Sequence, residues 1–560
     1  MAYIYKGTKT WWKEAVMYQI YPRSFNDSDG DGIGDLQGII QKLDYLQHLG
    51  VDVIWCSPIY QSPNDDNGYD ISDYRNIMTE FGSMADFDEL LAGVHQRGMK
   101  LIMDLVVNHS SDEHDWFQQS RLSKDNPYRD YYIWKPPVDG KEPNDWESFF
   151  GGSAWKFDEL TGEYFLHLFT QKQPDLNWES PKLRQEVYDL VKFWLDKGVD
   201  GFRMDVIPMI SKPQNFPAKG ERSFYELMEQ TYANGPRVHE FLQEFYNEVL
   251  SKYDIMTVGE GIGVSQANAN DYVGSDRQEL DMIFHFGHMF IDHGGGGRYD
   301  PGEMDFIEFK DIFSSWHEAL DERGWLNIYL DNHDFPRMVS RFGNDKDYHN
   351  ESGKLLATLI MTLRGTPCIY NGSEFGMTNV AFDNMDDYRD IETKNFLKIH
   401  IENGGNIDDF LKITHRQGRD NARTPIQWDN SKNAGFTTGT PWIKVNPNYT
   451  SINAVAAVAD ENSILNYYRQ LIELRKVMPV LIYGDYHILD KMHPQVFAFT
   501  RSLDDKKVLI LLNMSDENIN FETGLAINQL DFVIGNYSTE QTNGSHFELK
   551  PWQASVFSYF

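Results

Sequence analysis

Four short hydrophobic segments of this chain each end on an acidic, imidazole or guanidinium side chain. They span residues 100–109, 199–205, 255–260 and 326–334. Runs of this length, rich in Val, Ile and Leu, are typical of strands buried on both faces in a parallel sheet. In barrels built from such strands, the chemical groups stand at the carboxyl ends of the strands. We therefore expect the polar ends of these segments to lie together.

Amphipathic helical segments separate these strands. Apolar residues recur at helical spacing over 36–49, 87–94 and 183–194, and the first and last patterns stop at Gly50 and Gly198, which are suited to end a helix. A strand-like run follows each helix. Repeated strand–helix units predict an α/β fold, and their number favours a closed (β/α)8 TIM barrel over an open doubly wound sheet.

Two segments depart from this alternation. Residues 110–179 are rich in aromatic, Pro, Asp and Gly residues without a long helical period, which predicts a small subdomain inserted after the third strand. Residues 485–560 contain short strand-like runs separated by Asp, Asn and Gly turns, which predicts an all-β C-terminal domain, expected to be a β-sandwich. The remaining residues, 1–109 and 180–484, are assigned to the catalytic barrel.

The chain is strongly acidic. Its 560 residues carry 51 basic and 85 acidic side chains, a formal charge of −34. This charge repels nucleic acid and anionic membranes, so a neutral small-molecule substrate is favoured; a well-solvated surface is the simpler explanation. Residues 1–10 lack the apolar core of a signal peptide, and no run of about 18 apolar residues occurs. A cytoplasmic protein without membrane spans is therefore expected, and a monomer or weak homodimer is expected as well.

Both cysteines, Cys56 and Cys368, lie in apolar strand-like runs. Free cysteine behaves as a small hydrophobic residue in a protein core. We expect buried structural thiols, and we exclude a disulfide framework.

The segment 201–205 places a guanidinium two residues before a carboxylate. In a strand, Arg203 and Asp205 therefore point to the same face. The neighbouring positive charge favours the ionised form of Asp205, as a nucleophile requires. The alternative is an ordinary ion pair that closes a barrel layer, and the motif alone does not separate the two.

Two other strand ends contribute acids. Glu260 is either a proton donor facing a cleft or a solvated rim residue, and Asp334 is either a site residue or a helix N-cap. His333 and Asp334 are adjacent, so they point in different directions unless the chain turns there. Three acids and two histidines converging on one barrel mouth favour an active site.

Four motifs resemble, in order, the signature regions of the α-amylase family, glycoside hydrolase family 13. Three further segments are similar to those that mark its oligo-1,6-glucosidase subgroup. The four motifs are Asp-Leu-Val-Val-Asn-His (104–109), Gly-Phe-Arg-Met-Asp-Val (201–206), Thr-Val-Gly-Glu (257–260) and Asn-His-Asp (332–334), and the further segments are 173–178, 418–428 and 433–436.

The resemblance implies cleavage of a glycosidic bond with retention of configuration. In this mechanism Asp205 attacks the anomeric carbon to give a covalent glucosyl-enzyme, while Glu260 protonates the departing oxygen and then activates water. Asp334 is implied to grip sugar hydroxyls in the transition state. A retaining glycosidase of this kind needs no metal or organic cofactor for its chemistry.

The resemblance also implies a closed pocket for a terminal glucose. Asp66 would clamp the terminal sugar and the Tyr69 ring would stack on it, closing the far side of the pocket. Such a pocket makes an enzyme exo-acting. The side chains implied to bind hydroxyls of the innermost glucose are His109, Arg203, His333 and Arg419.

Two residues bear on the linkage that is cleaved. In the family, a valine after the nucleophile, here Val206, goes with α-1,6 cleavage, although strand packing also explains it; Glu392 matches a residue that holds the leaving sugar in α-1,6 enzymes. The implied substrates are isomaltose, isomalto-oligosaccharides and panose. The alternatives are an α-1,4 or broad-specificity α-glucosidase, a sucrose isomerase or glucosyl transferase, and a non-catalytic transporter heavy chain, which would lack the acids found here.

The loop 27–35 places acids at alternate positions with glycine at the sixth, as calcium loops do. Gly38 stands where an EF-hand has its bidentate Glu, and this excludes a standard EF-hand. Related glucosidases carry Ca²⁺ or Mg²⁺ on this loop, so a structural ion is expected; the alternative is a metal-free turn network. The candidate ligands are Asp27, Asp29, Asp31, the carbonyl of Ile33, and Asp35.

Overall fold

A closed barrel of parallel strands forms the centre of the computed structural model, which describes residues 9–538 and 544–559. Within these residues the sheet order is β11-β10-β9-β5-β2-β1-β15-β14, and a parallel bridge between Ile283 and Leu326 joins the two end strands. This confirms the expected (β/α)8 barrel. The strands are β1 (Met17–Ile20), β2 (Val53–Cys56), β5 (Lys100–Leu105), β9 (Gly201–Met204), β10 (Met256–Glu260), β11 (Met282–Phe284), β14 (Asn327–Ile328) and β15 (Thr366–Tyr370).

Helices pack around the barrel. The expected helix over 36–49 is wrong as a single element, because the Lys42 amide bonds back to the carbonyls of Ile39 and Ile40 and tightens the turn there. The other two predicted helices are confirmed. The outer helices include α2 (Leu36–Gln41), α3 (Leu43–Leu49), α4 (Met84–Gln96), α6 (Pro181–Lys197), α8 (Val238–Glu248), α10 (Phe306–Leu320), α12 (His349–Thr362) and α17 (Ile464–Val477).

Several strands end before the polar residues that were expected to terminate them. β9 stops at Met204 and β14 at Ile328, so Asp205 and Asp334 lie in the loops that follow; Glu260 alone of the three acids is the last residue of its strand. Gly201 is required where β9 meets β10, because a Cβ atom there would lie 2.0 Å from the carbonyl oxygen of Met256. Asp205 and Asp334 thus lie in turns that follow the strands, whereas Glu260 is held by β10 itself.

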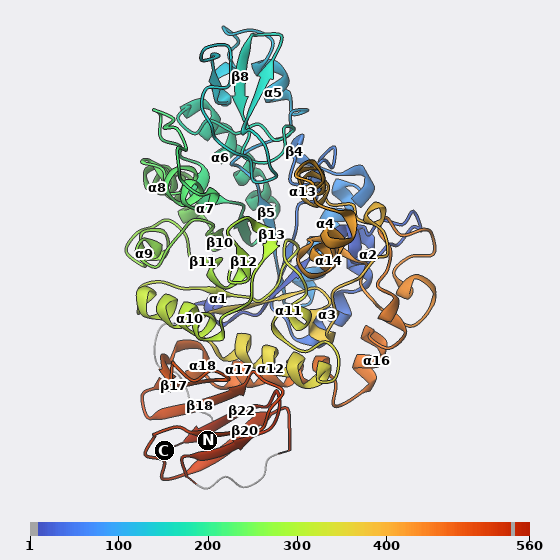
Figure 1. Cartoon of the computed structure of the whole chain (residues 1–560), viewed down its shortest axis with the longest axis vertical. Helices are drawn as coiled ribbons and strands as arrows, with labels where there is room; N and C mark the ends of the chain where they lie inside the picture. The colour runs from blue at the N-terminus through green and yellow to red at the C-terminus, as the bar shows by residue number, and fades with distance from the viewer. Residues whose placement is uncertain (1–8, 539–543, 560) are drawn as a thin grey trace.

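The segment inserted after β5 forms a small sheet over one end of the barrel (Figure 1). Its strands β6 (Trp134–Lys135), β7 (Trp155–Asp158) and β8 (Glu163–Leu166) pair in the order β6-β8-β7, beside α5 (Asp115–Ser120). The chain returns to the barrel through α6. The limits 110 and 179 for this subdomain stay predictions.

At the opposite end of the molecule lies an antiparallel sheet formed by the C-terminal residues (Figure 1). Its order is β16-β17-β18-β22-β20, and β19 pairs with β21 in a second sheet. A shared apolar cluster that includes Leu509, Phe521 and Phe557 packs the two sheets together. The limit at 485 stays a prediction. The strands are β16 (Asp485–Leu489), β17 (Val496–Leu503), β18 (Lys506–Asn513), β19 (Ile519–Glu522), β20 (Leu530–Gly535), β21 (His546–Leu549) and β22 (Ala554–Tyr559).

Two simpler expectations concern the core and the membrane. Cys56 and Cys368 are both buried and free, as predicted. Across the described ranges, every helix is too short or too polar to cross a membrane. Most of the N-terminal segment that was expected to lack a signal-peptide core, residues 1–8, lies outside the described residues.

Candidate active site

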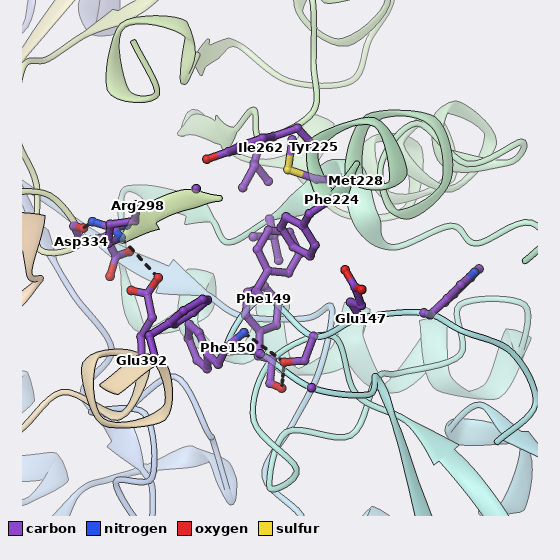
Figure 2. Close-up of a pocket in the computed structure, with 18 of the residues that line it drawn as sticks. Glu147, Phe149, Phe150, Phe224, Tyr225, Met228, Ile262, Arg298, Asp334 and Glu392 are labelled. Atoms are coloured by element: carbon purple, nitrogen blue, oxygen red, sulfur yellow. Dashed lines mark hydrogen bonds and ion pairs between the residues drawn. The ribbon is translucent and has the colours of Figure 1, made fainter. Parts of the chain in front are cut away.

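A cavity of about 810 Å³ is lined by residues that follow the barrel strands together with residues of the inserted subdomain. Figure 2 shows part of its wall, with Asp334, Arg298 and Glu392 on one side and Glu147 on the other. Of the sugar-site residues predicted from sequence, Arg203 and His333 are not part of the lining. Those that line the cavity are Asp66, Tyr69, His109, Asp205, Val206, Glu260, Asp334, Glu392 and Arg419.

Arg203 joins three buried acids behind the cavity. Its Nη1 lies 2.6 Å from Asp205 Oδ1 and 2.8 Å from Asp104 Oδ1, and its Nη2 lies 2.6 Å from Glu260 Oε2. The expected contact between Arg203 and Asp205 is therefore present, but it belongs to a larger network than a simple pair. One guanidinium brings the side chains that follow β9 and end β10 together.

Val206 turns the chain immediately after Asp205. It adopts a left-handed conformation (φ +35°), which is unusual and strained for a β-branched residue. In this conformation its backbone amide donates a hydrogen bond to Glu260 Oε2 at 2.8 Å. The side chain packs in an apolar cluster and also lines the cavity; its role in linkage preference stays a prediction.

Burial controls the protonation of the two neighbouring acids. It raises the pKa of Asp205 well above its ordinary value, with Arg203 opposing it and Glu260 adding to it. Burial likewise raises the pKa of Glu260, against Arg203 and the Val206 amide. Arg203 favours the ionised form of Asp205, as expected from the motif, but the cost of burial is larger. Because the two sites interact, they titrate as a pair that keeps a proton to higher pH than an isolated carboxyl group.

Asp334 lies among three nitrogen groups, two of them guanidinium groups. Its carboxylate lies 3.1 Å from His333 Nε2, 3.1 Å from Arg419 Nη1 and 2.9 Å from Arg423 Nη2. The chain turns after β14, which brings the adjacent His333 and Asp334 side chains together. The next helix, α11 (Met338–Phe342), begins beyond this turn, so Asp334 is not its N-cap. Although burial acts the other way, His333 and the guanidinium groups of Arg419 and Arg423 hold the pKa of Asp334 well below its usual value.

The far side of the cavity contains Asp66 and Tyr69. Asp66 Oδ1 lies 3.2 Å from Arg419 Nη2, and burial raises the pKa of Asp66 to about 7 despite that guanidinium. The Tyr69 hydroxyl donates to Asp104 Oδ2 at 2.9 Å. One face of the Tyr69 ring stacks on His333, with centroids 5.0 Å apart. His333 therefore positions two residues of the lining from behind it.

His109 is a neutral side chain of the lining. Burial and the nearby charge of Lys212 lower its pKa to about 3. Its Nε2 lies 3.3 Å from Gln173 Nε2, and that amide also donates to Asp66 Oδ2 at 3.2 Å. Gln173 belongs to the segment 173–178 of the inserted subdomain, so this subdomain helps to hold the pocket.

Glu392 lies between two guanidinium groups. It stands near the start of α13 (Ile391–Glu402), 3.3 Å from Arg298 Nε and 3.2 Å from Arg419 Nε. Arg298, on β13 (Gly297–Pro301), also donates to the backbone carbonyl of Asp334 at 2.7 Å. Burial raises the pKa of Glu392 against both cations.

Much of the cavity wall is aromatic, and the sequence argument did not identify these residues individually. The richness of 110–179 in aromatic residues was the available signal for four of them. The others lie on α7 (Phe224–Leu227), on α13 and in loops after several different strands, where no local pattern marks them. The aromatic residues missed are Trp146, Phe149, Phe150, Phe169, Phe224, Tyr225, Phe286, Phe290, Phe335 and Phe396.

The loop 27–35 gathers carboxylates away from the cavity. One oxygen from each of Asp27, Asp29 and Asp35 lies within 4.8 Å of the others. Asp31 is outside this group, and its carboxylate accepts the Ile33 amide at 2.8 Å. Clustered carboxylate oxygens suit a hard cation such as Ca²⁺ or Mg²⁺. The acids at 27, 29 and 35 thus fit a metal ion, while ligation by Asp31 and Ile33 stays a prediction.

Comparison with known proteins identifies the class to which this fold and site belong. The chain matches the model of the alpha amylase catalytic domain over residues 19–484. It therefore belongs to the α-amylase family and is a glycoside hydrolase.

Individual relatives cover nearly the whole chain. It is 55% identical over 557 residues to the oligo-1,6-glucosidase of Parageobacillus thermoglucosidasius, covering 98% of this chain and 99% of that protein. It is 49% identical over 508 residues to the trehalose-6-phosphate hydrolase of Bacillus subtilis strain 168, covering 90% and 89%. Among solved structures, the isomaltulose synthase of Protaminobacter rubrum has a TM-score of 0.96 and 46% identity, covering 99% of this chain and 100% of that one.

Proposed function

We propose that this protein is a retaining, exo-acting α-glucosidase that releases the terminal glucose from the non-reducing end of short oligosaccharides, with α-1,6 linkages preferred. The observation that carries the proposal is the single guanidinium of Arg203, which contacts both Asp205 and Glu260 at 2.6 Å. Retaining glycosidases need their two carboxyl groups close together, at about 5 to 5.5 Å, and a shared guanidinium supports the closer spacing.

In the proposed mechanism, the coupled pair starts the reaction with one proton. Asp205, in direct contact with Arg203, attacks the anomeric carbon as a carboxylate. Glu260 gives its proton to the departing oxygen, and the leaving sugar diffuses away. Glu260 then takes a proton from water as that water attacks the glucosyl-enzyme, which restores Asp205 and retains the configuration. Asp334, kept ionised by the guanidinium groups of Arg419 and Arg423, binds sugar hydroxyls as positive charge develops on the ring.

The closed side of the cavity supports exo action. Asp66 and Arg419 form an ion pair there, and Gln173 and His109 lie against it. A terminal glucose fits this side of the cavity because its hydroxyls can hydrogen-bond to these fixed polar groups in place of water. A chain that continues beyond this sugar would have to displace that ion pair.

The α-1,6 preference rests on the leaving-sugar side. Val206 and Glu392 both line the cavity, as the family pattern for α-1,6 cleavage requires. The oligo-1,6-glucosidase relative at 55% identity supports the same preference.

The charges of the cavity favour a neutral substrate. Its lining includes three cations, each of them in an ion pair: Lys219 with Glu147 at 2.6 Å, Arg298 with Glu392, and Arg419 with Asp66 and Asp334. The remaining acids of the lining add negative charge. A sugar phosphate would need a free cation, so trehalose 6-phosphate, named for one relative, is not the proposed substrate.

A sucrose isomerase is the second candidate, favoured by the likeness to isomaltulose synthase. In that reaction a hydroxyl of the released fructose, in place of water, attacks the glucosyl-enzyme. The same Asp205 and Glu260 would serve both reactions. The two reactions differ in whether water or a fructose hydroxyl attacks the glucosyl-enzyme.

Initial rates on isomaltose, panose, maltose, nigerose, sucrose and trehalose 6-phosphate, with products followed by NMR, test the proposal. We expect isomaltose and panose to be cleaved fastest, with α-glucose released first. Initial release of β-glucose would overturn the retaining mechanism. Equal or better rates on maltose would overturn the α-1,6 preference. Isomaltulose or trehalulose formed from sucrose would establish the second candidate.

We also propose a structural cation, Ca²⁺ or Mg²⁺, held by Asp27, Asp29 and Asp35. Its support is the clustering of their oxygens and the fit of carboxylates to hard cations. The ion would stabilise the loop and takes no part in bond cleavage. An organic cofactor is not part of the proposal, and cytoplasmic location and a monomeric or weakly dimeric state stay predictions.

A further inference from the structure

A buried carboxylate that the proposed mechanism does not use lies beneath the pocket floor. Asp390 is completely buried, is not part of the cavity lining, and stands at the N-cap of α13. Although burial acts to raise it, the neighbouring Arg419 and Arg423 hold the pKa of Asp390 well below its ordinary value. It is therefore a buried negative charge.

The two oxygens of Asp390 make different contacts. Oδ2 accepts hydrogen bonds from the backbone amide of Thr393 at 3.0 Å and from its hydroxyl at 2.9 Å, which caps the helix. Oδ1 accepts from Arg419 Nε at 2.9 Å and from Arg423 Nη1 at 3.1 Å. One carboxylate thus joins a helix terminus to two guanidinium groups.

Both guanidinium groups continue into the site. Arg419 reaches Asp66 at 3.2 Å and Asp334 at 3.1 Å, and Arg423 reaches Asp334 at 2.9 Å. Arg419 and Arg423 are 5% and 1% exposed, so protein contacts, not water, fix their orientation. Glu392, two residues after Asp390, stands on the helix that the other oxygen caps.

We propose that Asp390 is a positioning residue: from beneath the floor it fixes the two guanidinium groups that hold Asp334 and Asp66, and it ties them to the helix that carries Glu392. The inference rests on the proposed function, because that function assigns glucose binding to Asp334, Asp66 and Arg419. The competing interpretation is that Asp390 only caps α13.

Two substitutions separate these interpretations. Asp390→Ser keeps a good N-cap but cannot reach the guanidinium groups, and Asp390→Asn keeps the shape and an acceptor but removes the charge. We expect both to lower kcat/KM at least about 100-fold, as loss of alignment in a site can do. The loss should be similar on p-nitrophenyl α-glucoside and on isomaltose, because the glucose half of the site is common to both.

The matched control is Asp305→Ser. Asp305 caps α10 through the amides of Ile307 and Glu308, so the same exchange is made at a cap that is not part of the cavity lining. We expect wild-type kinetics for this variant. Far-UV circular dichroism and thermal melting establish that each variant is folded; if Asp390→Ser does not fold, Asp390→Asn decides.

Two outcomes would overturn the inference. Near-wild-type kcat/KM in the folded Asp390 variants would mean that Asp390 only caps α13. A loss confined to isomaltose would mean that Asp390 supports Glu392 alone. The aryl glucoside has no 1,6 linkage. A wild-type enzyme that is active on it but inactive on isomaltose would therefore contradict the proposed specificity. The Asp390 variants could still be compared with wild type on the aryl glucoside.

Discussion

The backbone amide of Val206 donates to Glu260 Oε2 at 2.8 Å, so the residue that follows the proposed nucleophile holds the proposed acid. The left-handed conformation of Val206 points this amide toward β10. A β-branched residue in that conformation costs about 1 to 3 kcal/mol, which the surrounding packing must offset. One oxygen of Glu260 is thereby occupied, and the other is left to carry the proton.

The first prediction concerns Glu260→Gln. The amide side chain keeps an acceptor for Val206 but cannot give up a proton. For isomaltose we expect kcat/KM to fall about 10²- to 10⁴-fold, the range for loss of a general acid. Measurements with p-nitrophenyl α-glucoside should show a smaller loss in kcat/KM, because nitrophenolate leaves without protonation. Equal losses on both substrates would contradict the assignment of Glu260.

Val206→Thr tests the linkage preference. Thr is close to Val in volume but brings a hydroxyl into the cavity wall. We expect the ratio of kcat/KM for isomaltose to that for maltose to fall about 10-fold, within the range for a single small group in a pocket. The conservative control Val206→Ile keeps an apolar wall and should keep the ratio above that of the Thr variant. An unchanged ratio of the two kcat/KM values in Val206→Thr would mean that Val206 serves packing only and does not set the linkage preference.

Asp66 should make stability depend on pH. Burial raises its pKa in the folded protein to about 7, above the value in the unfolded chain, so ionised Asp66 costs stability in neutral and alkaline solution. Asp66→Asn removes this cost. We expect the variant to melt at a higher temperature than wild type near pH 8, with the difference vanishing near pH 4, where both side chains are neutral. A wild type that melts higher at the alkaline pH would contradict the raised pKa.

The acidic loop gives a prediction about metal. Ca²⁺ at about 100 times its dissociation constant should stabilise the protein by about 2.7 kcal/mol, seen as a higher Tm that a chelator reverses. Asp29→Asn should weaken this response, because Asp29 is an exposed member of the carboxylate cluster. Exposed Asp44, outside the cluster, gives the control Asp44→Asn. Since the loop is not part of the cavity lining, kcat should stay constant in both variants.

Part of the site followed directly from local sequence. Alternation along a strand placed Arg203 and Asp205 on one face, and they are in contact. The barrel rule placed acids at the ends of β9, β10 and β14, where all three line one cavity. These predictions succeeded because they depend on strand geometry, which is set within a few residues.

Other features depend on contacts between distant segments. Arg423 lies within the segment 418–428 that the resemblance had marked, but nothing local indicated that it meets Asp334 and Asp390. The raised pKa of Asp205 could not be predicted from local sequence either, because the burial of a residue depends on the whole fold. The single helix expected over 36–49 failed for a smaller reason: apolar periodicity continues across Lys42 although the backbone does not.

The closure of the barrel has a consequence for inactivation. β1 and β2 share four paired positions, but β11 and β14 meet through the bridge of Ile283 with Leu326, beside a 3.4 Å hydrogen bond from the Ile283 amide to the Trp325 carbonyl. The contact between β11 and β14 is thus weaker than that between β1 and β2. The loop that carries Asp334 begins directly after β14. We expect heat to separate β11 from β14 first, so that Asp334 is displaced from the active site while the helices are still folded.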